Sequence, residues 1–153
     1  MEIERKFLVK HLPSLENYQT IKMLQAYVSI EPVIRIRKEN ESYVLTVKSK
    51  GGIAREEFEM NITKEEFESL LKKSEGILIE KTRYLIPLEN TLTAELDVFH
   101  GALAPLTTVE VEFSSIKEAE NFIVPDWFGE DISLDYRYKN NNLALHGLPT
   151  DIN

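Results

Sequence analysis

The feature that most constrains this chain is a two-residue alternation of charged and apolar side chains that recurs along most of its length. It is present at the start, where Glu2, Glu4 and Lys6 alternate with Ile3 and Phe7. Successive side chains of a β-strand point to opposite faces of its sheet, so each such segment has one charged and one apolar face. The sequence therefore predicts a β-rich α+β fold whose strands present their charges on a common face.

We predict eight strands, and all but the second carry charge on one face. Their ranges are 1–8, 21–28, 33–38, 43–48, 54–60, 77–86, 92–99 and 107–113. Short helices are predicted at 63–76, ended by Gly76, and at 115–122 and 140–146; the first two begin at Ser/Thr-x-x-Glu capping boxes. Trp127 and Phe128 are expected to pack as an aromatic lid, before an extended stretch at 131–139.

The charged faces contain a balanced set of acids and bases. The acids are Glu2, Glu4, Glu57, Glu59, Glu95, Asp97, Glu110 and Glu112, and the bases are Lys6, Arg35, Arg37, Lys48, Arg55, Lys81 and Arg83. Several like charges lie two residues apart on one strand, where they repel each other. An open sheet could expose these residues to water, or a closed barrel could enclose them around a charged ligand. The pattern alone leaves both arrangements open.

Composition narrows the possible functions. The 153 residues are expected to form one domain, 1–153, and the absence of cysteine excludes disulfides, thiolate metal sites and a catalytic thiol. A net charge of −8 argues against a nucleic-acid partner. No apolar run approaches the length of a membrane span and no signal peptide is visible, so we expect no membrane partner and a cytoplasmic location.

The order of the charged motifs resembles the CYTH superfamily, also called triphosphate tunnel metalloenzymes. The resemblance covers nearly the whole chain and includes the ExExK start Glu2–Lys6, the pairs Arg35/Arg37, Lys81/Arg83, Glu95/Asp97 and Glu110/Glu112, the segments 46–48 and 55–59, and the 135–140 end. It implies a closed eight-stranded antiparallel β-barrel with a few short helices outside. It also implies a tunnel that binds a small triphosphate together with a divalent metal.

The resemblance also implies roles for individual residues. Glu2, Glu4, Glu110 and Glu112 would be catalytic and hold Mg²⁺ or Mn²⁺, with Lys6 beside them. Phosphate oxygens would be bound by Lys6, Arg35, Arg37, Lys48, Arg55, Lys81, Arg83 and Arg137. The other tunnel acids, Glu57, Glu59, Glu95 and Asp97, would aim the bases, hold a second ion, order water, or pair with neighbouring bases.

The favoured function is metal-dependent hydrolysis of a triphosphate, and inorganic tripolyphosphate is the expected substrate because the chain is close to a minimal barrel. The alternatives are a class IV adenylyl cyclase or a thiamine triphosphatase of the same fold, or a non-catalytic module that binds polyphosphate or nucleotide. If the charges point inward, the apolar faces point outward, and the predicted helices are too few to cover them. We therefore predict a homodimer, joined through Ile34, Ile36, Leu45, Val47, Ala94, Leu96, Val98, Val109, Val111 and Phe113.

Overall fold

The computed structural model describes residues 1–51 and 53–149, and their strands form one sheet. The strands are β1 (Glu2–Val9), β2 (Gln19–Ser29), β3 (Val33–Glu39), β4 (Ser42–Lys48), β5 (Ala54–Arg55), β6 (Glu57–Asn61), β7 (Glu75–Pro87), β8 (Thr93–Phe99), β9 (Thr107–Glu112) and β10 (Phe128–Asp131). The helices are α1 (Lys64–Leu71), α2 (Ile116–Glu120) and α3 (Asn140–His146), with 3₁₀ turns η1 (Glu89–Thr91), η2 (Gly101–Leu103) and η3 (Tyr136–Tyr138).

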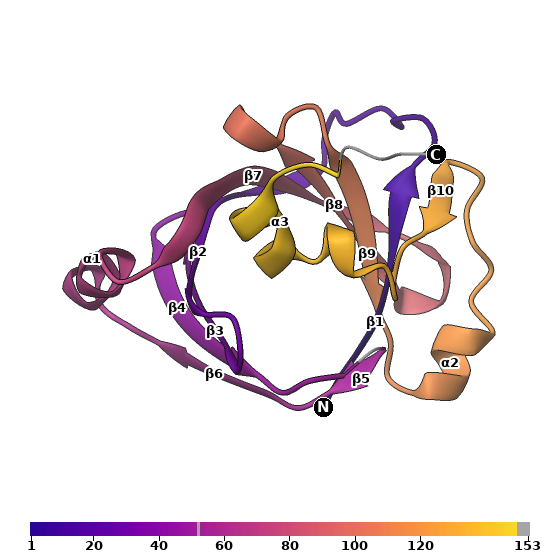
Figure 1. Cartoon of the computed structure of the whole chain (residues 1–153). Helices are drawn as coiled ribbons and strands as arrows, with labels where there is room; N and C mark the ends of the chain where they lie inside the picture. The colour runs from indigo at the N-terminus through magenta and orange to yellow at the C-terminus, as the bar shows by residue number, and fades with distance from the viewer. Residues whose placement is uncertain (52, 150–153) are drawn as a thin grey trace.

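The sheet closes into the predicted antiparallel barrel (Figure 1). Hydrogen-bonded neighbours run β1-β9-β8-β7-β2-β3-β4-β6, and β5 returns to β1 through the pairs Glu2↔Arg55 and Ile3↔Ala54. One residue separates β5 from β6, so these two segments act as a single interrupted strand. Counted this way, the ring has the eight strands that the sequence predicts.

One strand lies outside that ring and was not predicted. β5 pairs with the start of β1, whereas β10 pairs with its end, through Phe7↔Asp131 and Val9↔Phe128. Phe128, expected to pack with Trp127 in an aromatic lid, contacts that ring but lies in β10. The extended stretch predicted at 131–139 is wrong for Tyr136–Tyr138, which form η3. β10 pairs with β1 where β5 has ended. The physical reason is that β1 extends beyond β5, which leaves backbone groups on its second half available to another strand.

The first helix is shorter than predicted, because α1 ends at Leu71 and Gly76 lies inside β7. Gly76 has a φ of +73°, and a Cβ at this position would lie 2.3 Å from the carbonyl oxygen of Ala144. The glycine therefore serves the close approach of α3 to β7 rather than the end of α1.

Elements outside the barrel cover its apolar faces more fully than the sequence predicted. Leu96, Val109 and Val111 have no exposed surface and belong to a core that includes Ala119 of α2 and Phe128 of β10. The expected exposed patch is therefore wrong for Ile36, Ala94, Leu96, Val109, Val111 and Phe113, which are buried, and Ile34, Leu45, Val47 and Val98 are half-buried. Among the described residues, no helix is long and apolar enough to cross a membrane.

Helix α3 lies within the ring of strands, unlike α1 and α2 (Figure 1). Its residues Leu143 and Ala144 are buried against a cluster that includes Ile79 and Phe99. Ile79 lies two residues from Lys81 and Phe99 two residues from Asp97, so this cluster shares the charged inner face of the sheet. One part of the barrel interior is thus an apolar core, and the remainder is a polar cavity.

Candidate active site

The barrel encloses a cavity of about 650 Å³, lined by the C-terminal segment and by charged residues from every strand of the ring except β2. It brings together most of the residues predicted from the sequence. Those that line it are Glu2, Glu4, Lys6, Arg35, Arg37, Lys48, Arg55, Glu57, Glu59, Arg83, Glu95, Glu110 and Glu112. Lys81, Asp97 and Arg137 do not line it.

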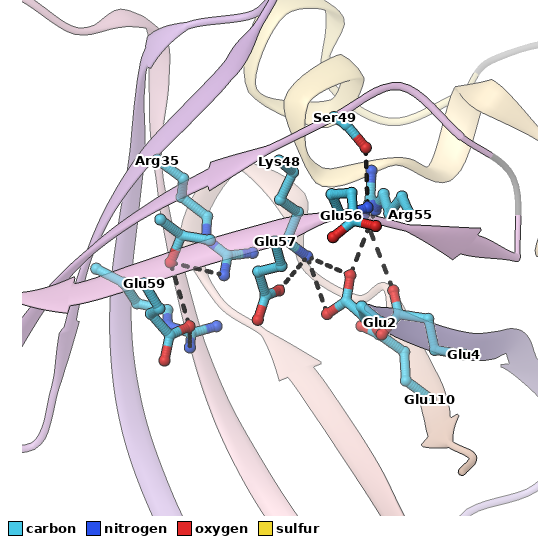
Figure 2. A network of polar contacts seen from close by, with 12 residues as sticks. Glu2, Glu4, Arg35, Lys48, Ser49, Arg55, Glu56, Glu57, Glu59 and Glu110 are labelled. Carbon is cyan, nitrogen blue, oxygen red and sulfur yellow. Dashed lines mark hydrogen bonds and ion pairs between the residues drawn. The ribbon is translucent and has the colours of Figure 1, made fainter. Parts of the chain in front are cut away.

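Glu2 is the centre of one ion-pair cluster (Figure 2). Lys48 Nζ lies 2.9 Å from Glu2 Oε1 and 3.4 Å from Glu57 Oε2, and Arg55 Nε lies 3.3 Å from Glu2 Oε1. Burial would raise the pKa of Glu2, but Lys48, a hydrogen bond with Glu57 and Arg55 together hold that pKa below its ordinary value. Glu2 is therefore a carboxylate, and it holds Lys48 and Arg55 against the cavity wall.

Glu4 and Glu110 form a second group, on the neighbouring strands β1 and β9. Burial raises the pKa of Glu4 well above its ordinary range, and the adjacent carboxylates of Glu110 and Glu2 raise it further. Burial would also raise the pKa of Glu110, but the charges of Lys6, Arg83 and Lys81 hold it well below that range. In the metal-free protein, Glu4 is thus the protonated partner and Glu110 the ionised one.

Behind this pair lies a fully buried charge network. Asp97 accepts hydrogen bonds from Lys81 Nζ at 2.8 Å, from Arg83 Nε at 2.8 Å and from Arg83 Nη2 at 2.9 Å. Burial lowers the pKa of Lys81 to about 8, although Asp97 opposes that shift. Since Arg83 reaches the cavity and the other two do not, Asp97 and Lys81 form a support that aims Arg83.

Two arginines of β3 face the cavity from the opposite side. Arg35 is 7% exposed, its Nη2 lies 3.4 Å from Thr46 Oγ1, and its Nε has no partner among the described residues. Arg37 forms an ion pair with Glu39, and its Nη2 lies 3.9 Å from Glu59 Oε2. A buried guanidinium whose donors are incompletely paired is a site for an anion, because burial without a partner is costly.

The C-terminal segment contributes residues that were not predicted to bind substrate. Lys6 Nζ donates to the carbonyl oxygen of Tyr138 at 2.7 Å, and Ser133, Lys139 and Asn140 line the cavity. Burial lowers the pKa of Lys139, as do the charges of Arg55 and Lys6. Lys139 and Asn140 belong to the 135–140 segment, the same segment from which Arg137 was predicted to bind phosphate.

That residue, Arg137, lies outside the cavity. Its Nη2 lies 2.7 Å from Asp135 Oδ2, and its Nε donates to Asp135 Oδ1 at 3.0 Å. The same carboxylate accepts the backbone N–H of Arg137 at 3.1 Å and so caps η3. In this structure Arg137 stabilises the turn that carries Tyr138 and Lys139 to the cavity.

The residues that line the cavity fit a hard divalent cation. Carboxylate oxygens are the ligands that hard divalent cations prefer, and a bound cation would relieve the repulsion between Glu4 and Glu110. Within the described part of the chain, no three carboxylates stand close enough to hold a metal by themselves.

Comparison with known proteins identifies the family. The family model for the CYTH domain matches residues 1–144. The inorganic triphosphatase of Nitrosomonas europaea is 46% identical over 149 residues, covering 94% of this chain and 97% of the relative. The inorganic triphosphatase of Acetivibrio thermocellus is 34% identical, covering 94% and 92%. A crystal structure of an inorganic triphosphatase superposes with a TM-score of 0.72 at 41% identity, over 97% of each chain. On this agreement of barrel, charged cavity and sequence, the chain belongs to the CYTH domain family.

Proposed function

We propose that this protein hydrolyses inorganic tripolyphosphate in a reaction that requires Mg²⁺ or Mn²⁺. The observation that carries the proposal is the opposition, across one enclosed cavity, of the basic residues around Arg35 and the carboxyl pair Glu4 and Glu110. A polyanion that carries a divalent cation matches both sides at once. The names of the two curated relatives support the same activity.

The basic residues would bind the phosphate chain. Lys6, Arg35, Arg37, Lys48, Arg55 and Arg83 all line the cavity, and arginine can contact phosphate with two parallel hydrogen bonds. Because Lys48, Arg83 and Lys6 are held in place by Glu2, Asp97 and the carbonyl oxygen of Tyr138 respectively, these three cations need little reorganisation when charge develops on the transferred phosphoryl group. Lys139 extends the same set from the C-terminal segment.

The carboxylates would hold the metal. Glu4 and Glu110, with Glu2 and Glu112 beside them, are the proposed ligands, and a bound cation would supply charge neutralisation and polarise a phosphate oxygen. Glu57, Glu59 and Glu95 contact Lys48, Arg37 and Arg83, so their proposed role is to aim these bases. Lys81, which was predicted to bind phosphate, and Asp97, one of the other tunnel acids, would instead support Arg83.

A substrate panel tests this function. Tripolyphosphate, ATP and thiamine triphosphate would be incubated with Mg²⁺ or Mn²⁺, and the products separated by chromatography. We expect orthophosphate from tripolyphosphate as the fastest reaction, since the aromatic side chains that line the cavity, Tyr27 and Tyr138, are both buried and offer no open surface for a base. Cyclic AMP with pyrophosphate as the main products of ATP would contradict the proposal, as would binding without turnover of any of the three.

The homodimer and the cytoplasmic location remain predictions from the sequence. The original basis of the dimer is weaker, since most of the proposed interface residues are buried within one chain. The outer face of β6 is the remaining candidate surface, because Phe58 and Met60 are 58% and 46% exposed and lie on one face of that strand.

A further inference from the structure

Gln25 is a fully buried, uncharged polar residue on the inner face of the barrel. It lies in β2, opposite Arg37 of β3, while Tyr27 lies opposite Arg35. Gln25 is 0% exposed and Tyr27 is 3% exposed, and Tyr27 lines the cavity. The amide is therefore next to the phosphate-binding arginines but behind the cavity surface, where an apolar side chain would pack without any polar group to satisfy.

The two ends of this amide have different surroundings. Gln25 Nε2 donates to the hydroxyl oxygen of Tyr27 at 3.0 Å. Gln25 Oε1 is buried and has no partner among the described residues. A buried acceptor without a partner lowers stability and calls for an explanation. The hydrogen bond from Gln25 Nε2 to Tyr27 is the interaction that can explain why an amide lies here.

That hydrogen bond determines what the phenol can do. The oxygen of Tyr27 accepts from Gln25, and its other polar neighbour is the guanidinium of Arg35, which can only donate. The O–H proton must therefore find an acceptor elsewhere, and no residue within 1–51 and 53–149 accepts it. Since Tyr27 lines the cavity, an anion bound there would offer acceptor oxygens to the Tyr27 O–H and to the unpartnered Nε of Arg35.

We propose that Gln25 is a positioning residue, which holds the Tyr27 oxygen as an acceptor so that the Tyr27 O–H donates to a phosphate oxygen of the triphosphate. This inference rests on the proposed function for the identity of the anion. No bond is broken and no proton leaves Tyr27. The phenol adds a neutral donor to a set of cations, in a place where a lysine or arginine would add further like-charge repulsion.

A double-mutant cycle tests whether Gln25 acts through Tyr27. Gln25→Met keeps the length of the side chain and removes the donor, and Tyr27→Phe removes the hydroxyl. We expect kcat/KM for tripolyphosphate to fall by about tenfold in each single variant, and the double variant to be no slower than Tyr27→Phe alone. Losses that multiply in the double variant, or an unchanged rate in Gln25→Met, would overturn the proposal.

The matched control is Thr108→Val. Thr108 is also 0% exposed, and its Oγ1 also has no partner in the described part of the chain, but it is not bonded to Tyr27. Its removal should leave kcat/KM unchanged. Gln25→Met should be at least as stable as the parent protein in thermal unfolding, because it removes an unpartnered acceptor; if it does not fold, Gln25→Asn, whose amide is too short to reach Tyr27, takes its place in the cycle.

A measurement without turnover separates this inference from the proposed function. With fluorotyrosine incorporated, the ¹⁹F resonance of Tyr27, identified by its loss in Tyr27→Phe, should move when tripolyphosphate is added and should move less in Gln25→Met. Normal hydrolysis by both single variants with an unmoved resonance would refute the positioning role and leave the triphosphatase assignment intact. A resonance that moves in the expected way, in a protein that does not hydrolyse tripolyphosphate, would support the positioning role and refute the triphosphatase assignment.

Discussion

Asp97→Asn should strongly destabilise the protein, although it changes few atoms. Asp97 is 0% exposed and neutralises both Lys81, whose side chain is 1% exposed, and Arg83. After the change, Arg83 keeps Glu95 at 3.2 Å and Glu110 at 3.8 Å, but Lys81 has no other ion-pair partner among the described residues. Removing one partner of a buried pair costs about 3–5 kcal/mol.

The expected loss can be measured as a melting temperature. For a chain of this size, 1 kcal/mol corresponds to a shift of about 2–4 °C. Taking the lower end of the energy, because asparagine keeps the shape and one acceptor, Asp97→Asn should melt about 6–12 °C lower by circular dichroism. The deficit should narrow as the pH rises toward about 8, the pKa of Lys81 in the parent protein, because loss of Asp97 lowers this pKa further and the lysine of the folded variant loses its proton first.

A cycle with Lys81→Met identifies the cause. If the cost comes from the stranded ammonium, the double variant should be more stable than the sum of the two single changes predicts, by more than about 1 kcal/mol. Costs that add within about 0.5 kcal/mol would refute the reasoning, since Asp97 would then stabilise the barrel independently of Lys81. A wild-type melting temperature in Asp97→Asn would refute it directly.

Three further predictions follow from the cavity. Glu4→Gln should lower turnover with Mg²⁺ by about 100-fold or more, and full turnover of this variant would exclude Glu4 as a ligand. Burial raises the pKa of Glu4 from 4.5 to about 9, so without metal the folded protein retains a proton that the unfolded chain loses. The melting temperature should therefore fall as the pH rises from 4.5 to about 9, and Mg²⁺ should bind more tightly over the same range. A melting temperature and an Mg²⁺ affinity that both stay constant with pH would contradict this prediction. Arg35→Ala should weaken tripolyphosphate binding in calorimetry about 10- to 100-fold, whereas the exposed Lys64→Ala should not, and equal effects would argue for diffuse electrostatics.

The alternation of charge predicted the inner face of the barrel well. It grouped Arg35 with Arg37 and Glu110 with Glu2, and each of these lines the cavity. This succeeds because a period of two assigns a side chain to a face without knowledge of its partners. The same period could not assign depth along the barrel, so Lys81 shares a face with Arg83 but is buried below the cavity.

The features that the sequence did not reveal depend on contacts between distant segments. The range of α3 was predicted, but its place inside the ring was not, because an apolar stripe on a helix does not say which surface it meets. The position of Gln25 was overlooked for a related reason, since it lies on the strand without charge. The 135–140 segment does contribute to the cavity, but through Lys139 and Asn140, whereas the side chain of Arg137 stabilises the turn before them.

The pairing of β1 has a consequence for how the chain folds. This strand is made first, but its partners β9 and β10 are near the other end of the chain; Arg5 and Asp131, which form an ion pair, are 126 positions apart. Contacts of such long sequence separation slow folding, because the chain must close a large loop before they form. Glu4 and Lys6 therefore lack Glu110 and the carbonyl oxygen of Tyr138 until late in synthesis, whereas the partners of Glu2, Lys48 and Arg55, are made earlier. The active site is completed only after β9, the last strand of the ring to be made. A ribosome-bound fragment that ends before β9 should therefore contain most of the barrel's strands but neither the complete barrel nor the site.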